Sequence, residues 1–483
     1  MGIISKRLLF SCLAFGITAC LCLSLLSIAA VTVLLTTSNE SASLLPTATM
    51  LSPSHTPYPL IPTSTPAAEV LPTSEVAHPT STTVLPEELS IQMDEIESQV
   101  SELRGLHTGN QVPRNLLTQD QLQQQVLTDF MKDYTAEEAR DDAIELAAFG
   151  LLESDFDLYK LYVDLFTEQI AGYYDHEKDS MYIVQGSGFN GFERETYSHE
   201  YTHALQDQTY DIEKGLNWND EACDLDTERC AAIQALLEGD ARLTESQWLN
   251  TYASPQDIQD ILDFYSTFES PVYDTTPAFL QQDFIVFPYE KGLAFVEYLY
   301  DEGGWRAVDE AYHSPPVSTE QILHPERYPS DQPKQVDIPD LLPVLGEGWR
   351  EVTQNTHGEW YTYLTLAYGL DSSARLDPEN ASQAAEGWGG DSYTVLYNDN
   401  TDETVMLLVT NWDTDRESRQ FAEAFKEYAS GRFGSPHVEG NNLTSWESAE
   451  GNTLFKLDGA RTIWIFAPDT STAETILGTL STP

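Results

Sequence analysis

An uncharged apolar run, Leu8 to Leu35, limits what the first part of this 483-residue chain can fold into. The run is longer than the roughly 7–15 residues of a signal-peptide core, and it suffices for a transmembrane helix, which needs about 20 residues. Lys6 and Arg7 precede it, and positive charges favour the cytoplasmic side of a membrane. We therefore expect a single-pass cell-membrane protein with residues 1–7 in the cytoplasm, residues 8–35 in the membrane and the remainder extracytoplasmic.

Cys20 offers a second way to anchor the chain. It ends the sequence Ile17-Thr18-Ala19-Cys20, which resembles the lipobox of bacterial lipoproteins. The apolar run continues well past Cys20, which favours the helical anchor, and a lipoprotein anchor stays the alternative. Both interpretations place the bulk of the chain outside the cytoplasmic membrane.

Residues 36–88 are rich in Pro, Ser and Thr and contain no Lys or Arg. Such a composition cannot build a hydrophobic core and favours an extended linker. Helical apolar spacing then dominates up to a Pro-rich stretch between Pro315 and Pro343, where we place a domain boundary. The pattern predicts an α+β protein, with a mostly helical domain over residues 89–330 that includes a short edge sheet, and a smaller α+β domain over residues 345–483.

The chain is strongly acidic, with 24 Lys and Arg against 78 Asp and Glu and a formal net charge of −54. This balance excludes sequence-independent binding of nucleic acid, which needs a basic protein surface. It also disfavours docking on an anionic membrane through charge. The acidity is typical of a soluble, self-repelling surface. An acidic cleft that selects basic substrates is an alternative that the sequence does not locate.

Only Cys223 and Cys230 lie beyond the apolar run. In an oxidising compartment, so short a spacing predicts a local disulfide that closes one loop. The alternative is a pair of zinc ligands, but no second Cys or His pair stands nearby to complete a set of four.

The sharpest chemical signal is the sequence His199-Glu200-Tyr201-Thr202-His203. It lies in a helical segment, Phe192 to about Gln208, and residues four apart on a helix face the same way. Zn²⁺ favours neutral imidazole nitrogens, so His199 and His203 are candidate metal ligands. Glu200 lies beside His199 and can reach a water molecule at the metal as a general base without being a ligand itself. The alternative is a surface helix that contains this pattern by chance.

A second helical segment, from Thr227 to about Asn250, contains Glu238-Gly239-Asp240. One carboxylate from this helix would complete a His, His, Glu ligand set and leave a fourth position for water. Glu238 and Asp240 point about 200° apart on a helix, so both cannot face one metal. We choose Glu238 as the third ligand, and Asp240 or Glu245 could orient a ligand from behind.

The histidine motif followed by the glutamate helix resembles the gluzincin, or thermolysin-like, zinc metallopeptidases. The chain resembles more closely an uncharacterised bacterial family of predicted membrane-anchored metalloproteases. The segments that carry the likeness are Arg104-Gly105-Leu106, Gln169 to Asp175, His199 to Gln208, Pro288 to Gly292, Ser318 to Pro325 and Gly387 to Asp391. The resemblance implies a zincin-like catalytic domain with an active-site helix, a glutamate helix and an edge strand. The strand candidate is Met181 to Val184, after a turn at Tyr174 to Glu177.

In gluzincins a Tyr or His beyond the glutamate helix stabilises the oxyanion of the tetrahedral intermediate. The resemblance makes Tyr289, His324 and Tyr328 the candidates here; helix packing is the alternative for Tyr289 and a structural hydrogen bond for His324. Trp388-Gly389-Gly390-Asp391 is a weaker signal, because a Gly pair beside Trp is typical of tight turns as well as of a peptide or carbohydrate subsite.

Together these patterns predict an extracytoplasmic zinc-dependent endopeptidase. His199, His203 and Glu238 would hold Zn²⁺, and Glu200 would be the general base. Its partner would be a protein or peptide substrate, without nucleic acid, and the number of subunits is not predicted. The alternatives are a non-catalytic zincin-like cell-surface binding or adhesion protein and a zinc hydrolase of a non-peptide amide. The intact Glu200 favours an enzyme, because a binding protein would be free to lose it.

Overall fold

The computed structural model describes residues 85–480 apart from residues 133, 185–187 and 441. The predicted cytoplasmic stub, the apolar run, Cys20 and nearly all of the linker lie outside the described residues. Within those residues, no helix combines the length and the apolar character that a membrane span requires.

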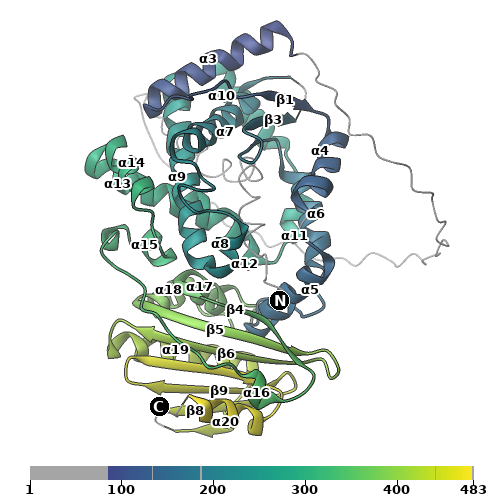
Figure 1. Ribbon diagram of the computed structural model, residues 1–483, viewed down its shortest axis with the longest axis vertical. Helices are drawn as coiled ribbons and strands as arrows, with labels where there is room; N and C mark the ends of the chain where they lie inside the picture. Colours follow the sequence, from purple (N-terminus) through teal and green to yellow (C-terminus); the bar gives the residue numbers. More distant parts are fainter. Residues whose placement is uncertain (1–84, 133, 185–187, 441, 481–483) are drawn as a thin grey trace, which may run out of the picture.

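The protein is α+β, as the sequence predicts (Figure 1). The first part is mostly helical and holds a three-stranded sheet, β1 (Arg114–Leu117), β2 (Gly172–Asp175) and β3 (Ser180–Val184). Its helices are α3 (Glu87–Arg104), α4 (Gln119–Gln125), η2 (Val126–Phe130), α5 (Ala136–Ala148), α6 (Leu158–Gln169), α7 (Gly191–Tyr210), α8 (Asp220–Leu225), α9 (Thr227–Thr251), α10 (Pro255–Thr267), α11 (Pro271–Thr275), α12 (Ala278–Gln281), η3 (Gln282–Lys291), α13 (Gly292–Gly303), α14 (Trp305–His313), α15 (Thr319–Leu323) and η4 (Pro325–Arg327).

The C-terminal part is built on a seven-stranded antiparallel sheet in the order β4-β5-β6-β10-β9-β8-β7. Its elements are α16 (Leu342–Leu345), β4 (Trp349–Asn355), α17 (Gly358–Tyr368), α18 (Pro378–Ala385), β5 (Trp388–Asn398), β6 (Glu403–Trp412), α19 (Asp415–Phe433), β7 (Val438–Glu439), β8 (Leu443–Ser448), β9 (Gly451–Asp458), β10 (Arg461–Ala467) and α20 (Thr470–Thr479). The β9–β10 hairpin turns at Gly459, whose φ of 61° suits glycine.

The small sheet corrects the sequence-based choice of edge strand. Strand β3, which includes Met181 to Val184, lies in the middle of the sheet, parallel to β1 and antiparallel to β2. Strands β1 and β2 form the two edges, and β2 runs through Tyr174 and Asp175, where the sequence pattern placed the start of a turn. The sequence pattern missed β2 because it is short and all but its last residue are buried, so no polar-apolar alternation marks it.

Helices α7 and α9 pack against each other and begin at well-formed caps. The Asn190 side chain accepts a hydrogen bond from the Phe192 N–H, and the Glu193 side chain accepts one from the Asn190 N–H, which starts α7. Asp226 caps α9 by accepting a hydrogen bond from the Arg229 N–H. Cys223 and Cys230 form the local disulfide that their spacing predicts, which ties α8 to the first turn of α9.

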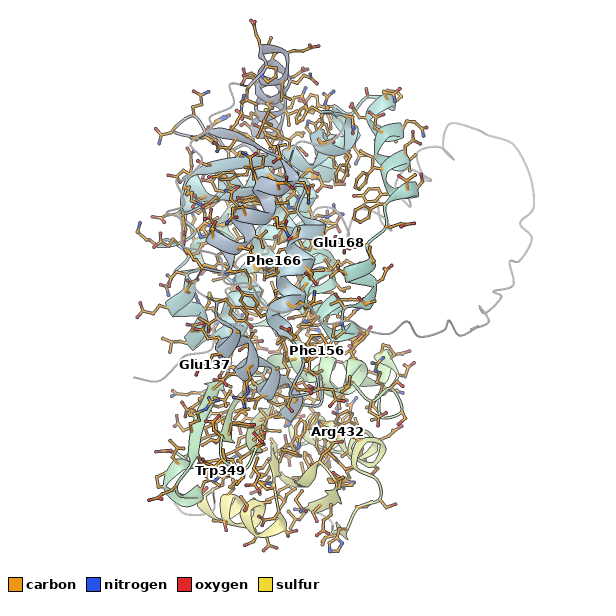
Figure 2. All side chains as sticks on the ribbon, turned by 90° about the vertical axis from the view of Figure 1, so that its right-hand side faces the viewer. Glu137, Phe156, Phe166, Glu168, Trp349 and Arg432 are labelled. Atoms are coloured by element: carbon orange, nitrogen blue, oxygen red, sulfur yellow. A yellow bond between two sulfur atoms is a disulfide. The ribbon has the colours of Figure 1, made fainter. Side chains whose placement is uncertain are left out.

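The two parts of the chain share one hydrophobic core. This core joins Leu146 and Phe149, around α5, to residues of the C-terminal sheet such as Tyr393 and Trp464. The Tyr393 hydroxyl donates to Glu145 of α5, and Arg350 of β4 pairs with Asp141. Figure 2 shows the α5 region, marked by Glu137, next to the C-terminal sheet, marked by Trp349. The Pro-rich stretch therefore connects two parts that are packed together.

Candidate metal centre

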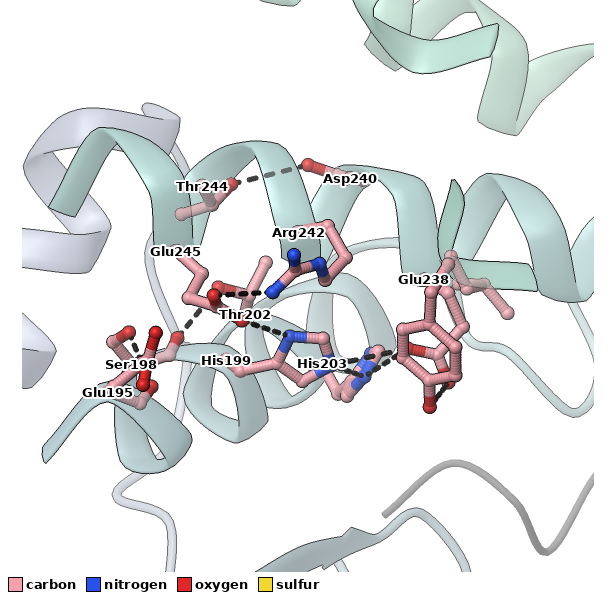
Figure 3. A network of polar contacts seen from close by, with 12 residues as sticks. Glu195, Ser198, His199, Thr202, His203, Glu238, Asp240, Arg242, Thr244 and Glu245 are labelled. Atoms are coloured by element: carbon pink, nitrogen blue, oxygen red, sulfur yellow. Dashed lines mark hydrogen bonds and ion pairs between the residues drawn. The ribbon is translucent and has the colours of Figure 1, made fainter. Parts of the chain in front are cut away.

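His199 and His203 of α7 meet Glu238 of α9 in the buried space between the two helices (Figure 3). The two Nε2 atoms lie 3.1 Å apart, and Glu238 Oε2 lies 3.2 Å from the Nε2 of His199 and 3.5 Å from that of His203. These three residues form a group that could hold a metal ion.

Each imidazole is held from behind by an acceptor at its other nitrogen. His199 Nδ1 lies 3.0 Å from Glu245 Oε2, and His203 Nδ1 lies 2.8 Å from Gln206 Oε1. The Gln206 amide is oriented in turn, because its Nε2 donates to the Leu237 carbonyl at 2.9 Å. With a proton on each Nδ1, both Nε2 lone pairs face the centre, which is the arrangement of metal-ligating histidines.

Glu245 is itself fixed, because the Arg242 guanidinium donates to its Oε1 at 2.7 Å. Figure 3 shows Glu245 between Arg242 and His199. Burial alone would lower the pKa of His199, but the hydrogen bonds and charges of Glu238 and Glu245 outweigh it and raise that pKa to about 10. The carboxylates therefore favour positive charge at this point of the protein, whether a proton or a metal ion carries it.

Tyr289 orients the third residue of the triad, Glu238. Its hydroxyl donates to Glu238 Oε1 at 2.9 Å, which leaves Oε2 toward the two histidines. Tyr289 stands in η3, a π-helix that contains Pro288. Proline has no N–H to donate and disrupts a regular α-helix, and π-turns are frequent at functional sites.

Glu200 is buried beside the triad and is aligned by the edge strand. Its Oε2 accepts a hydrogen bond from the Tyr174 N–H of β2 at 3.0 Å, and its Oε1 has no hydrogen-bond partner among the described residues. Burial raises the pKa of Glu200 to about 8, with the charges of Glu238 and Glu245 adding to the effect and His199 and the Tyr174 hydrogen bond opposing it. A carboxylate with such a pKa can exchange protons near neutral pH.

Glu195 lies one turn before His199 on α7 and is fully buried. Neither of its carboxyl oxygens has a hydrogen-bond partner within the described part of the chain. Burial, together with the charge of Glu245, raises its pKa well above the ordinary value, against the opposing effects of Arg242 and His199. Burial therefore favours the protonated, neutral form of Glu195.

The geometry of the triad fits a tetrahedral ion. Bonds of 2.0–2.1 Å to Zn²⁺ require donor atoms roughly 3.3 Å apart. The three donor–donor distances, 3.1, 3.2 and 3.5 Å, match that spacing. Two lone-pair nitrogens and a carboxylate oxygen so close together repel one another unless a proton or a metal ion lies between them.

Of the other sequence-based candidates, Tyr289 reaches the centre, but as a donor to Glu238. His324 does not: its Nε2 pairs with Glu359 Oε1 of α17 at 2.9 Å. Helix α15, just before it, contacts α9 through Thr319 and Glu228, which lies ten residues, or about 15 Å, from Glu238. His324 thus has the structural hydrogen bond that was the alternative to its predicted oxyanion role.

Tyr328 and Asp240 also serve elsewhere. The Tyr328 hydroxyl donates to the Ser314 carbonyl at 2.7 Å. Asp240 accepts from Arg104 Nε and from the Tyr312 hydroxyl, both at 2.7 Å, and so fastens α3 and α14 to α9. Of the two carboxylates considered for orienting a ligand, Glu245 has that position.

Asp391, in the Trp388-Gly389-Gly390-Asp391 segment, accepts hydrogen bonds from the N–H groups of His357 and Gly358 and from Trp388 Nε1. These contacts connect β5 to the start of α17. They agree with the alternative in which this segment forms a tight turn.

Three residues of the site were missed from the sequence: Tyr174, Gln206 and Arg242. Gln206 and Arg242 had a local signal, since each lies three residues along a helix from its partner, and such residues are neighbours. Tyr174 acts through its backbone, so no side-chain pattern identifies it.

Residues 344–477 match a sequence family described as a domain of unknown function, DUF8575. This match covers the C-terminal sheet and leaves out the triad. No curated protein matches the chain. A crystal structure from Chloroflexus aurantiacus, of "a putative hydrolase with a novel fold", is similar over 51% of this chain and 89% of its own, with 16% identity and a TM-score of 0.33. So distant a likeness carries no statement on function, which has to be argued from the site.

Proposed function

We propose that this protein is a zinc-dependent endopeptidase of the gluzincin type, with His199, His203 and Glu238 as the zinc ligands. The observation that carries the proposal is the triangle of two imidazole nitrogens and one carboxylate oxygen, with edges of 3.1–3.5 Å. A His₂Glu set that leaves one position open is typical of catalytic rather than structural zinc sites.

Zn²⁺ bound there would supply a Lewis acid that polarises the substrate carbonyl and lowers the pKa of water. Glu200 accepts the proton of the attacking water and then donates it to the leaving amine. The Tyr174 N–H holds Oε2 of this carboxylate, so Oε1 is the oxygen that exchanges the proton. Glu245 and Gln206 keep the two imidazoles in one tautomer throughout.

Strand β2 supports a peptide as the substrate. The Tyr174 N–H points away from β3 toward Glu200, so the backbone of Gly172, two residues earlier, faces the same side. An extended peptide can pair with this side of an edge strand through main-chain hydrogen bonds. In such pairing, the carbonyl groups of the substrate peptide would lie near Glu200.

We place this activity outside the cytoplasm. The apolar run Leu8 to Leu35 after Lys6 and Arg7 supports that location. The Cys223–Cys230 disulfide supports it as well, because such bonds persist in oxidising compartments.

The decisive experiment compares the purified full-length chain with its Glu200→Gln variant for zinc content and for cleavage of a denatured protein. We expect one zinc per chain in both, and a cleavage rate about 10²- to 10⁴-fold lower in the variant. Glu213→Gln, which removes an exposed carboxylate just after α7, is the matched control and should cleave normally.

Zinc without cleavage by either protein would favour the binding or adhesion alternative. Cleavage that survives Glu200→Gln would disprove the assigned base. A full-length chain that binds no zinc would overturn the proposal altogether.

A further inference from the structure

A cavity lies away from the triad, where the start of β2, the start of α7 and helix α10 meet. Its volume is about 580 Å³. Residues Ile170 and Ala171, just before β2, form part of its lining, together with Phe192 near the start of α7. We call this space the α10 cavity.

The lining of the α10 cavity is acidic. It includes the carboxylates of Glu168, Glu193, Asp260 and Asp263, and no Lys, Arg or His is among the described residues that line it. Glu168, labelled in Figure 2, comes from the end of α6. The four carboxylates form no ion pair with any described residue, and the adjacent Arg194 is engaged by Asp257 at 3.3 Å.

Their hydrogen bonds come from neutral donors. Glu168 accepts from the N–H groups of Val272 and Tyr273, and Asp260 from the Gly191 N–H. Burial and the charge of Asp260 raise the pKa of Glu193, against the hydrogen bonds from its own N–H and that of Asn190. The negative charge in the α10 cavity is thus left without a cation in the described part of the protein.

A buried acceptor stands beside these carboxylates. Gln169 lines the α10 cavity and is 1% exposed. Its Nε2 donates to Glu168 Oε2 and to Ser270 Oγ, which fixes the amide, and its Oε1 has no hydrogen-bond partner among the described residues. A ligand with N–H groups would supply the donor that this buried carbonyl oxygen lacks.

Part of the lining is aromatic. Phe192 and Phe264 stack with centroids 3.7 Å apart, and Phe268 stacks on Phe264 at 5.1 Å. All three rings line the cavity. An aliphatic stem packs well on such a surface, and a cation is attracted to the faces of the rings.

The α10 cavity lies within reach of a peptide bound at the triad. Ala171 precedes Tyr174 by three residues, which is about 10 Å along a strand. Phe192 precedes His199 by seven residues, which is again about 10 Å along a helix. Each of these two distances equals the length of about three residues of an extended peptide.

We propose that the α10 cavity binds a Lys or Arg side chain of the substrate, about three residues from the bond that is cleaved. The proposal rests on the proposed peptidase function and names its specificity. The aliphatic stem lies on the phenylalanine rings, and the cationic head meets the carboxylates and Gln169. A negative or short side chain at this position gains neither contact.

The test uses short fluorescent peptides that share one apolar sequence and carry a single Lys at successive positions, each beside a norleucine version. Binding is measured by anisotropy to the full-length Glu200→Gln chain, which isolates affinity from turnover. We expect at least about 10-fold tighter binding of Lys than of norleucine at one position. In the Asp260→Asn, Asp263→Asn double variant, the affinities for the Lys and norleucine peptides should differ by no more than about 2-fold, because two negative charges are lost. Each Asn keeps an acceptor oxygen, so local hydrogen bonds can persist.

The matched control is Glu269→Gln with Asp274→Asn, which removes the same charge from exposed positions outside the cavity. Equal losses in both double variants, or no Lys preference at any position, would overturn the proposal. Cleavage of the same peptides by the wild type tests the peptidase separately. A Lys preference without cleavage would support the binding site in the α10 cavity and contradict the proposed peptidase activity. Cleavage without a Lys preference would support the peptidase activity and contradict the binding site.

Discussion

At the scale of single residues, the candidate centre depends on what stands behind each ligand. Glu245 and Gln206 each occupy one imidazole nitrogen, and Tyr289 occupies one oxygen of Glu238. The remaining donor atom of every ligand is thereby turned to a common point. Partners of this kind typically change metal affinity 10- to 100-fold when they are removed.

Tyr289→Phe removes the hydroxyl that orients Glu238 and leaves the ring in place. We expect zinc affinity to fall about 10- to 100-fold, because the freed carboxylate can rotate away from the histidines. Competition with a chromophoric chelator measures this change. Tyr328→Phe is the control, since that hydroxyl donates to the Ser314 carbonyl instead. Equal zinc affinities in the two variants would contradict the role given to Tyr289.

The sequence predicts the residues whose relation is local. His199, Glu200 and His203 are linked by helical spacing, so the motif alone brings them to one face. Glu238 required a choice between two carboxylates, and the angle between them on a helix showed only that both could not face one metal. Tyr174 could not be found in this way, because its contribution is a backbone N–H brought to Glu200 by the pairing of β2 with β3.

At the scale of elements, a pair of glycines sets the distance between α9 and α13. A Cβ on Gly239 would lie 2.1 Å from the Gly292 carbonyl oxygen, and one on Gly292 would lie 2.2 Å from the Ala235 carbonyl oxygen. The two backbones are therefore in direct contact next to Glu238. No side chain other than hydrogen fits at either position.

Gly239→Ala should push α9 from α13 and displace Glu238 from the histidines. We expect a loss of about 2–3 kcal/mol in the free energy of unfolding, because the clash is with backbone, and weaker zinc binding in addition. Denaturant titration and chelator competition measure the two effects. Gly478→Ala in α20, where the new Cβ meets nothing within 4 Å, should be neutral or slightly stabilising. Similar stability of both variants would rule out this account of the packing.

Element types were predictable where a periodic pattern was long. The spacing of apolar residues places α7 and α9 close to their observed bounds. It does not reveal β1 or β2, which have four residues each. It also treats Tyr289 as part of a regular helix, whereas Pro288 widens that segment into a π-helix.

At the scale of the whole molecule, Glu228 joins the two parts of the chain. It lies in the first turn of α9, and its Oε1 accepts hydrogen bonds from the Thr319 N–H and hydroxyl, both at 2.7 Å. Its Oε2 lies against Gly358 at the start of α17. Burial raises the pKa of Glu228 to about 8, with the charges of Asp391 and Asp226 adding to the effect and the Thr319 hydrogen bonds opposing it.

This raised pKa predicts a dependence of stability on pH. The folded state keeps the proton of Glu228 up to about pH 8, and the unfolded chain loses it near the ordinary value of 4.5. Stability should therefore fall as pH rises from about 4.5 to 8, by at most about 1.4 kcal/mol per pH unit, and level off above. Glu228→Gln carries no such proton, so its stability relative to the wild type should increase across that window.

Melting temperatures at pH 5, 7 and 9 (about 2 pH units apart) test this prediction. Both proteins keep His199, His203 and Glu238 unchanged, so the pH dependence of that site cancels in the difference. Glu302→Gln on the exposed side of α13 should show a constant difference from the wild type. A constant difference for Glu228→Gln as well would contradict the assignment.

The arrangement of the two parts was only partly visible in the sequence. The Pro-rich stretch and the change of pattern indicate where the C-terminal part begins, and the family match starts at residue 344. Neither shows that α5 packs on the C-terminal sheet, because that contact joins Asp141 to Arg350 across more than two hundred residues. Shared cores of this kind leave no local pattern.

Helix α9 runs 25 residues, about 37 Å, and touches three distant parts of the protein. Glu228 at one end meets Thr319, Glu238 faces the histidines, and Trp248 at the other end donates to Gln99 of α3. Anything that binds Glu238 only in the folded chain stabilises all three connections by mass action. If the triad holds the proposed zinc, a chelator that removes it should lower the temperature at which the C-terminal sheet unfolds, although that sheet contributes no ligand.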